Sequence, residues 1–260
     1  NFRFLGGGAF WSNRIVYHWN KTVVEGLDVL DPITRILDMS RIGPVLTFED
    51  GAVRKGPPVT AMLVQNTNPA AVAPDTNRVL KGLKRDDLFL CVHEQFLTET
   101  AQLADIVLPA TMFLEHDDIY QAGGHMHLQI HRAVIEAPEQ TRSNHWVINE
   151  LAKRLGAQHP GFGMTEWELI DKTLLDSGWP SADALLEKKW HDVQPSFADS
   201  HFLNGFPTST GRFQFSADWS QLGSLGSKLP NYPDHCDNID SATAEKPFRL
   251  VTSPARNYLN

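Results

Sequence analysis

Residues 62–109 constrain the fold of this chain more than any other stretch, because they hold two short apolar runs that end abruptly in polar residues. The runs are residues 62–64 and 88–92, and residues 65–68 and 93–94 follow them. A segment long enough for a helix separates the two runs. Apolar runs of this length are typical of buried parallel strands. The stretch therefore predicts a strand–helix–strand unit.

Residues that start and end helices extend this unit. A helix is expected from Asp75 to Leu83, with the Asp75 carboxylate near its positive N-terminus. Thr98 is expected to cap a second helix over residues 99–103, and residues 105–108 predict a third strand. Strand, helix, strand, helix and strand at this spacing predict an α/β fold with a doubly wound parallel sheet.

Weaker patterns predict the other elements. A short helix is expected within residues 33–42, and the alternating residues 125–131 predict an exposed strand. Asn144 is expected to cap a helix that Gly156 ends. The expected apolar face of that helix is Val147, Ile148, Leu151, Ala152 and Leu155. Further expected elements are helices over 166–176 and 181–190 and a strand over 212–216.

These patterns divide the chain into four segments. Residues 1–57 form an irregular lead-in, residues 58–160 the α/β core, residues 161–247 a helical and loop-rich C-terminal extension, and residues 248–260 the start of a following domain. The chain begins without Met and stops just after the apolar-to-polar run FRLVTS. We interpret it as a piece of a larger protein.

Charge and cysteine content exclude several classes of partner and site. The 260 residues carry a formal charge of −8 and no basic stripe, which argues against a nucleic-acid partner. No apolar run of about 18 residues occurs, so no membrane span is expected. Two cysteines are too few for a disulfide framework or a four-thiolate cluster. Cys91, inside a predicted strand, is expected to be a buried and inert thiol.

Two polar turns are expected to lie side by side at the carboxyl edge of the sheet, where open α/β sheets bind ligands. Asn68 belongs to the first turn, whose amides and hydroxyl can hydrogen-bond a ring edge or a ribose. Glu94, beside His93 in the second turn, can accept hydrogen bonds from guanine or from ribose hydroxyls. The alternatives are an Asn-Pro turn without function and a solvated strand end.

Four histidines leave a metal site open as an alternative: His116, His125, His127 and His131. Alternation places the last three on one strand face, where two imidazoles can chelate zinc. No HExxH motif occurs and nothing fixes a third ligand, so exposed surface histidines are the favoured interpretation. A serine hydrolase lacks its GxSxG turn, and the glycines at 6–8 lack the GxGxxG spacing.

The segments QNTNPAAVAPD, DDLFLCVHEQFLTETAQLADIVLPATMFLEHDD and LQIHRAVIEAPEQTRSNHWVINELAKRLG resemble the molybdopterin oxidoreductases of the dimethyl-sulfoxide-reductase superfamily. The most specific element is TETAQLADIVLPAT with the acidic residues after it. The likeness is strong over residues 57–157, weak over 158–245, and returns in GRFQF and PFRLVTSPARNYLN. It implies that the core is a Rossmann-like domain holding one guanine dinucleotide arm of a bis-molybdopterin cofactor.

The resemblance also implies a set of cofactor contacts. Glu94 stands where many relatives have Asp and would recognise the guanosine. His116 stands where some relatives place a lysine near the phosphates, and Asn144 stands where relatives often have Asp before a helix. The full implied set is Asn68, His93, Glu94, Thr98, His116 and Asn144, with Thr252, Ser253 and Arg256 as pterin contacts.

For the intact protein, the resemblance implies a molybdenum-dependent oxidoreductase. Oxygen-atom transfer or a coupled two-electron oxidation would take place at molybdenum held by two molybdopterin guanine dinucleotides, and the chemistry would be the cofactor's. Its partners would be a small-molecule substrate and, as an open expectation, an electron-transfer subunit. The protein ligand of molybdenum and any [4Fe–4S] cluster would precede this stretch, so the piece alone is expected to be inactive.

Three points stay open at the level of sequence. The cytoplasm is the default location, with the periplasm open because an export signal would precede this stretch. A non-catalytic scaffold subunit of the same ancestry is one alternative function. A histidine-based metallohydrolase is the other.

Overall fold

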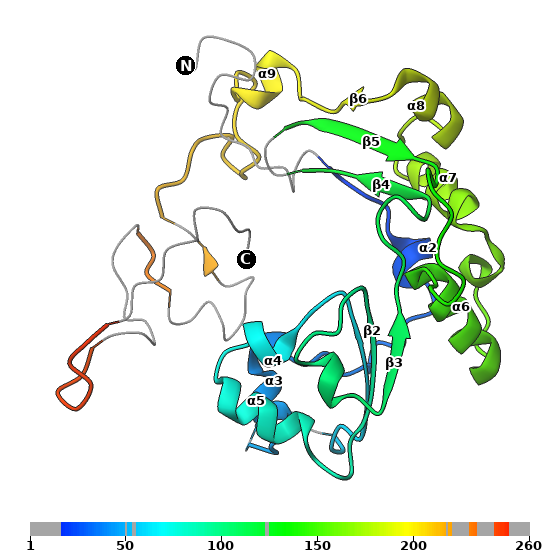
Figure 1. Ribbon diagram of the computed structural model, residues 1–260. Coiled ribbons are helices and arrows are strands. Elements are labelled where there is room, and N and C mark those ends of the chain that lie inside the picture. The colour runs from blue at the N-terminus through cyan, green and yellow to red at the C-terminus, as the bar shows by residue number, and fades with distance from the viewer. Residues whose placement is uncertain are drawn as a thin grey trace. The chain divides into compact units, whose positions relative to one another are not determined.

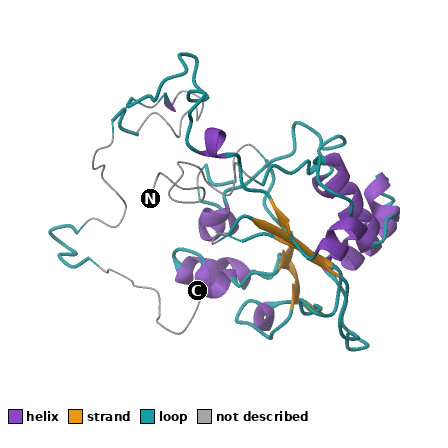
Figure 2. Ribbon diagram, turned by 90° about the horizontal axis from the view of Figure 1, so that it is seen from above, coloured by secondary structure: helices purple, strands orange, loops and turns teal. Residues whose placement is uncertain are grey.

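The computed structural model describes residues 17–49, 51–53, 56–122, 125–216, 218–219, 229–232 and 242–249. Residues 3–195 form one compact unit, and residues from Ser196 onward form a second. Figure 2 shows the helices of the first unit lying to either side of its strands. No helix in the described ranges is long and apolar enough to cross a membrane.

A parallel sheet is one of two three-stranded sheets of the first unit (Figure 1). Its strands are β1 (Ala61–Gln65), β2 (Phe89–Glu94) and β3 (Ile106–Pro109), in the order β1-β2-β3. All neighbours pair in parallel. The α/β fold with a parallel sheet is thereby confirmed, while its doubly wound, Rossmann-like arrangement stays a prediction.

One face of this sheet carries a closed core. The helices are α3 (Ile42–Leu46), α4 (Pro69–Val72) and α5 (Thr76–Leu83), with the 3-10 turn η2 at Ala101–Leu103. The buried core side chains are Leu46, Val64, Ala70, Val79, Leu83, Leu88, Leu90, Val92 and Ala101. Asp75 caps α5 as expected, since its side chain accepts from Arg78 N. A Cβ on Gly82 would lie 2.4 Å from the Cβ of Leu46, so this glycine permits the close approach of α3 and α5.

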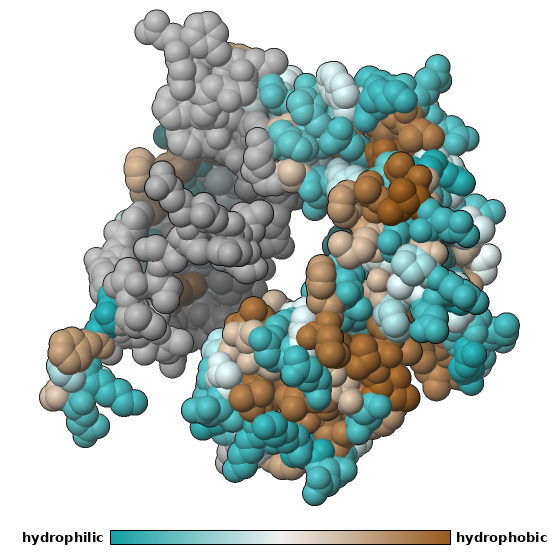
Figure 3. All heavy atoms as spheres, viewed as in Figure 1, coloured by the Kyte–Doolittle hydropathy of each residue, from teal (hydrophilic) through white to brown (hydrophobic). Residues whose placement is uncertain are grey.

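Most of the opposite face of the sheet is uncovered in the part of the chain that is described. Leu63, Phe89 and Ile106 point to that face and are 37%, 50% and 45% exposed. Figure 3 shows hydrophobic side chains gathered at the surface over β2 and β3. Cys91 lies on the same face and is partly exposed, which corrects the expectation of a buried thiol. The physical reason is that the described residues cover this side of β2 at its carboxyl end, around His93, and leave Cys91 partly open.

An antiparallel sheet forms a second core in the same unit. Its strands are β4 (Asp118–Tyr120), β5 (His127–His131) and β6 (His191–Asp192), with β5 in the middle. The helices are α6 (Asn144–Leu155), α7 (Glu166–Asp176) and α8 (Ala182–Lys188), with α2 at Thr22–Glu25 and the 3-10 helix η3 at Pro160–Gly163. Leu128, Ile130, Leu174, Ala182 and Leu185 are buried in this core. A strand within residues 125–131 and both later helices are confirmed. The expectation of an exposed strand is wrong, because β5 pairs on both sides and buries Leu128 and Ile130 against the helices.

Several helix boundaries correct the sequence expectations. Residues 33–42 do not form one helix: the 3-10 helix η1 (Met39–Arg41) leads into α3 at Ile42, because Asp38 caps η1 through Ser40 N. Thr98 Oγ1 accepts from Ala101 N, but only the turn η2 follows.

Helix α6 also differs from its expected form. Ser143, rather than Asn144, is its cap, because the Ser143 side chain accepts from Trp146 N. Of the expected apolar face, only Val147 and Ala152 are buried; Ile148, Leu151 and Leu155 are exposed. The predicted end is confirmed, with Gly156 at φ +68.

The second unit holds the helix α9 (Phe197–Ser200). The strand expected over residues 212–216 is wrong: these residues form no strand, and Phe213 and Phe215 are exposed. An alternating pattern needs a neighbouring strand to complete its hydrogen bonds. The division of the chain near residues 57, 160 and 247 stays a prediction.

Candidate functional site

A cleft opens at the carboxyl ends of the three parallel strands. Its lining includes Asn66, directly after β1, Gln95, directly after β2, and Thr111, just past β3. The other polar residues of the lining are His116, Asp117, Asp118, Ser143, Asn144, His145 and Glu166. We call this cavity of about 320 Å³ the edge cleft. It lies where open α/β sheets bind ligands.

A second cavity of about 440 Å³ adjoins the edge cleft. The two cavities share Thr111, His116, Asp117, Ser143, His145 and Glu166. Ligand sites usually measure roughly 300–1,000 Å³. The two lobes together are therefore large enough for an extended polar ligand.

Thr111 organises the centre of the edge cleft. Its Oγ1 lies 2.8 Å from His116 Nδ1, and its carbonyl accepts from Gln95 Nε2 at 2.9 Å. The other ring nitrogen of His116 lies 3.7 Å from Asp118 Oδ2. This arrangement orients the imidazole from both sides.

The N-terminus of α6 forms one wall of the cleft. Ser143 accepts from Trp146 N at 3.2 Å and donates to Glu166 Oε1 on α7. Asn144 is the first helical residue, and its side chain lies in the cleft lining. The start of a 12-residue helix offers free backbone N–H groups and about half a positive charge.

Arg142, which precedes the helix cap Ser143, continues the edge of the parallel sheet. Arg142 pairs with Ala110 in a parallel bridge. Arg142 N donates to Pro109 O at 3.0 Å, and Arg142 O accepts from Thr111 N at 3.1 Å. The start of α6 is thus fixed against the end of β3.

Two of the residues implied by the resemblance line the edge cleft, namely His116 and Asn144. The lining does not include Asn68, His93, Glu94 or Thr98. Thr252, Ser253 and Arg256 lie outside the described residues.

Hydrogen bonds within the protein hold the residues that stay out of the cleft. Asn68 Oδ1 accepts from Thr100 Oγ1 at 2.8 Å, and Asn68 Nδ2 donates to Glu99 Oε2 at 2.7 Å. The hydrogen bond from Asn68 lowers the pKa of the Glu99 carboxyl. Glu94 Oε1 accepts from Gln95 N, and His93 is completely buried.

Sequence reasoning missed several cleft residues. Asn66 belongs to the first polar turn indicated by the sequence, although only Asn68 was singled out there. Gln95 had a usable signal, because it is the first residue beyond a strand. Asn66 also has φ +53, a left-handed conformation that Asn tolerates better than most residues. Glu166 had no local signal, since it meets Ser143 across 23 residues.

The chemistry of the lining suits a ligand rich in hydrogen-bond donors. Asp117, Asp118 and Glu166 are carboxylates, which only accept hydrogen bonds when ionised. Guanine N–H groups and ribose hydroxyls match such acceptors, and the helix N-terminus matches a phosphate. Over the described ranges, no group of three or more His, Cys, Asp or Glu side chains gathers to hold a metal ion.

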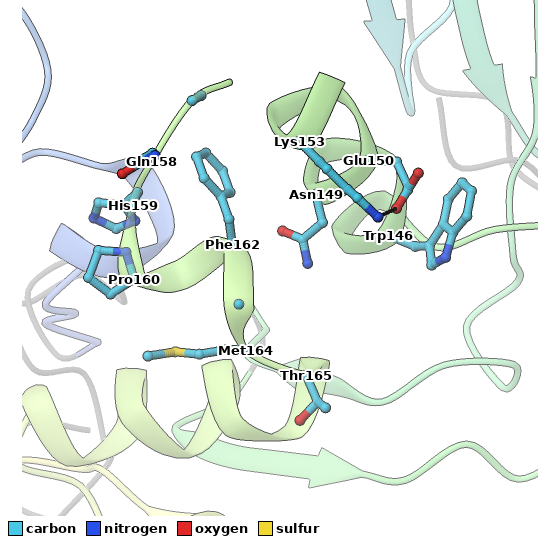
Figure 4. Close-up of a pocket in the computed structure, with 12 residues that line it drawn as sticks. Trp146, Asn149, Glu150, Lys153, Gln158, His159, Pro160, Phe162, Met164 and Thr165 are labelled. Atoms are coloured by element: carbon cyan, nitrogen blue, oxygen red, sulfur yellow. Dashed lines mark ion pairs between the residues drawn. The ribbon is translucent and has the colours of Figure 1, made fainter. Parts of the chain in front are cut away.

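A larger hollow of about 920 Å³ lies between α6 and η3 (Figure 4). Trp146, Asn149 and Lys153 reach it from α6, and Phe162 from η3. In the figure, the ion pair between Lys153 and Glu150, whose atoms are 3.9 Å apart, joins two side chains of α6 on one side of this hollow. None of its lining residues follows a strand of the parallel sheet, so we place the candidate site in the edge cleft.

Known proteins share the sequence and fold around this cleft. Residues 46–154 match the family model of the molybdopterin oxidoreductases. The probable oxidoreductase YoaE of Bacillus subtilis is 34% identical over 98% of this chain and 36% of its own length. The trimethylamine-N-oxide reductase of Haemophilus influenzae is 24% identical over 85% of this chain and 30% of its own length.

A solved structure shares the fold. Acetylene hydratase from Pelobacter acetylenicus superposes with a TM-score of 0.59 at 22% identity, over 78% of this chain and 26% of that one. The chain spans about a third of the length of the curated relatives it matches. The resemblance noted in the sequence is thereby confirmed: residues 46–154 of this chain are a molybdopterin oxidoreductase domain.

Proposed function

We propose that the edge cleft binds the guanosine end of a molybdopterin guanine dinucleotide in a molybdenum-dependent oxidoreductase. One observation carries the proposal: polar residues beyond all three parallel strands meet the N-terminus of α6 in one cavity. Most of its wall residues fall in the region that matches the family, among them Asn66, Gln95, Thr111, His116 and Asn144.

The residues of the cleft would bind and orient the nucleotide. Carboxylates at Asp117, Asp118 and Glu166 would accept from the guanine and ribose. The N-terminus of α6 and the imidazole of His116 would lie toward the phosphates. When bound, the molybdenum–pterin end of the cofactor supplies the redox chemistry. We assign no catalytic or metal-ligating residue to this chain.

The proposal extends to the whole protein by family membership. The trimethylamine-N-oxide reductase among its relatives supports a small-molecule substrate. The bis form of the cofactor, an accompanying [4Fe–4S] cluster, an electron-transfer subunit and the inactivity of the chain by itself belong to the same proposal. The pterin contacts at Thr252, Ser253 and Arg256 are part of it as well.

Cofactor analysis of the purified full-length protein tests the function. Molybdenum by elemental analysis and GMP released by acid hydrolysis should both be close to stoichiometric. Zinc without molybdenum would support a metallohydrolase instead. The absence of both metals and of GMP would support a scaffold.

Three variants test the site. Asn144→Ala should lower molybdenum and GMP content together, whereas Lys153→Ala, on the same helix but outside the edge cleft, should leave both unchanged. Glu94→Ala tests the contact implied by the resemblance. Full cofactor content in Asn144→Ala would show that Asn144 is not part of the binding site. Full content in Glu94→Ala would show the same for Glu94.

A further inference from the structure

His93 is a completely buried polar residue in an unexpected place. Its side chain points to the same face of the parallel sheet as Phe89 and Cys91, the face that is uncovered elsewhere. Among the described residues, another segment covers this face at the carboxyl end of β2. That segment contains Arg142, and His93 is bonded to it.

The hydrogen bonds of His93 define its tautomer. Nε2 lies 3.0 Å from Arg142 O, and a carbonyl can only accept, so Nε2 carries the proton. Nδ1 then accepts from Gln65 Nε2, 3.2 Å away on β1. Both nitrogens of the neutral ring are satisfied inside the protein. His93 thus has no free polar atom to offer to a ligand.

The Arg142 carbonyl connects His93 to the edge cleft. It accepts from both His93 Nε2 and Thr111 N. Thr111 contacts His116, and Ser143, directly after Arg142, caps α6. A loss of the bond from His93 would therefore loosen two walls of the cleft at once.

We propose that His93 is a positioning residue: through the Arg142 carbonyl it holds Thr111 and the start of α6 in the geometry that binds the nucleotide. This inference rests on the proposed function for its effect on binding. It replaces the direct cofactor contact that the resemblance implied for His93. The positioning itself is a property of the chain and can be measured without a ligand.

Three substitutions separate the two ring nitrogens. In His93→Gln, the amide nitrogen reaches about as far as Nε2 and can donate to Arg142 O. The shorter side chain of His93→Asn reaches only the position of Nδ1, beside Gln65. His93→Met fills the space without a strong donor. If His93 is a positioning residue, His93→Gln should preserve the geometry of the cleft, whereas His93→Asn and His93→Met should not.

Hydrogen exchange by mass spectrometry on the 260-residue chain is the first measurement. In the Asn and Met variants, peptides covering residues 109–116 and 142–148 should exchange about five- to tenfold faster, as expected for one lost hydrogen bond. The Gln variant should stay within about twofold of the parent. Peptides from α5 should not change in any variant. Unchanged exchange at 109–116 and 142–148 in the Met variant would overturn the proposal, as would faster exchange throughout the sheet and α5.

Equilibrium dialysis with guanosine diphosphate is the second measurement. The Asn and Met variants should bind it about tenfold more weakly than the parent, and the Gln variant should bind nearly as well. Equal loss in all three variants, with normal exchange, would show a direct contact and overturn positioning. If the parent itself fails to bind, the proposed function of the cleft is wrong, and the exchange measurement alone decides the role of His93.

Discussion

Thr111 shows how one residue can join the parallel sheet to the candidate site. Its N–H donates to Arg142 O, its carbonyl accepts from Gln95, and its hydroxyl meets His116. The residue is buried, so water cannot readily replace these partners. Its hydroxyl therefore matters for the orientation of His116 rather than for the fold as a whole.

Thr111→Val tests this role. Val keeps the shape and both backbone hydrogen bonds but removes the partner of His116 Nδ1, so only the contact with Asp118 then orients the imidazole. We expect guanosine diphosphate to bind about five- to tenfold more weakly, which corresponds to one net hydrogen bond. Thr76→Val, at an exposed position on α5, is the matched control and should bind normally. Normal binding by Thr111→Val would show that His116 needs no orientation from Thr111.

The sequence identified the edge of the sheet but could not assign each side chain along it. Asn66 and Asn68 are the same residue type, two positions apart. A left-handed backbone at Asn66 places that side chain in the cleft lining, while Thr100 and Glu99 engage Asn68. The contacts of Asn68 depend on partners about 30 residues away, which no local pattern contains.

At the scale of elements, the sequence predicted the start of a helix best where a side chain caps its own helix. The predicted helix over 166–176 matches α7, where Thr165 and Glu168 form a reciprocal capping box. By contrast, the start of α6 was displaced by one residue, because Ser143 and Asn144 are both good caps. The choice between them depends on Glu166, which bonds Ser143 from another helix.

Ser143→Ala should destabilise the start of α6. An N-cap serine contributes about 0.5–2 kcal/mol, and this one also contacts Glu166 on α7. We expect a comparable loss of unfolding free energy in urea denaturation and weaker nucleotide binding. Ser181→Ala removes the cap of α8, away from the cleft, and should lower stability without affecting binding. If both variants bind equally well, the start of α6 is not part of the site.

The capping box of α7 predicts a pH dependence. Hydrogen bonds from the Thr165 backbone and hydroxyl lower the pKa of Glu168 below its ordinary value of 4.5. A carboxyl whose pKa is lowered by folding stabilises the protein above its unfolded pKa, and this contribution is lost as the pH falls through the lowered pKa. The stability difference between the parent and Glu168→Gln should therefore be full at pH 7 and disappear in strong acid. Glu187→Gln, at an exposed position on α8, controls for net charge; a constant difference for Glu168→Gln from pH 7 to pH 2 would contradict the prediction.

At the scale of the first unit, burial is distributed unevenly between two cores. One face of the parallel sheet packs against α3, α4 and α5, and a separate cluster lies under the antiparallel sheet. The apolar pattern of β1 and β2 predicted strands buried on both sides. Periodicity could not show the uncovered face, because a continuous apolar run reads the same whether one or both faces are packed.

Two leucines of the parallel sheet allow the stabilities contributed by its two faces to be compared. Leu90 on β2 is 1% exposed among the core residues, whereas Leu63 on the neighbouring strand faces the uncovered side at 37%. Leu90→Ala should lower the free energy of unfolding by about 2–5 kcal/mol, because it removes buried methyl groups and leaves a cavity. Leu63→Ala leaves no closed cavity and should lower it by about 1 kcal/mol. Urea denaturation of the 260-residue chain, with hydrogen exchange of the strand amides as a local check, compares the two variants. Equal losses of unfolding free energy in the two variants would mean that the face carrying Leu63 is as well packed as the core. The same truncation costs as much on both faces of a sheet only where both faces are closed.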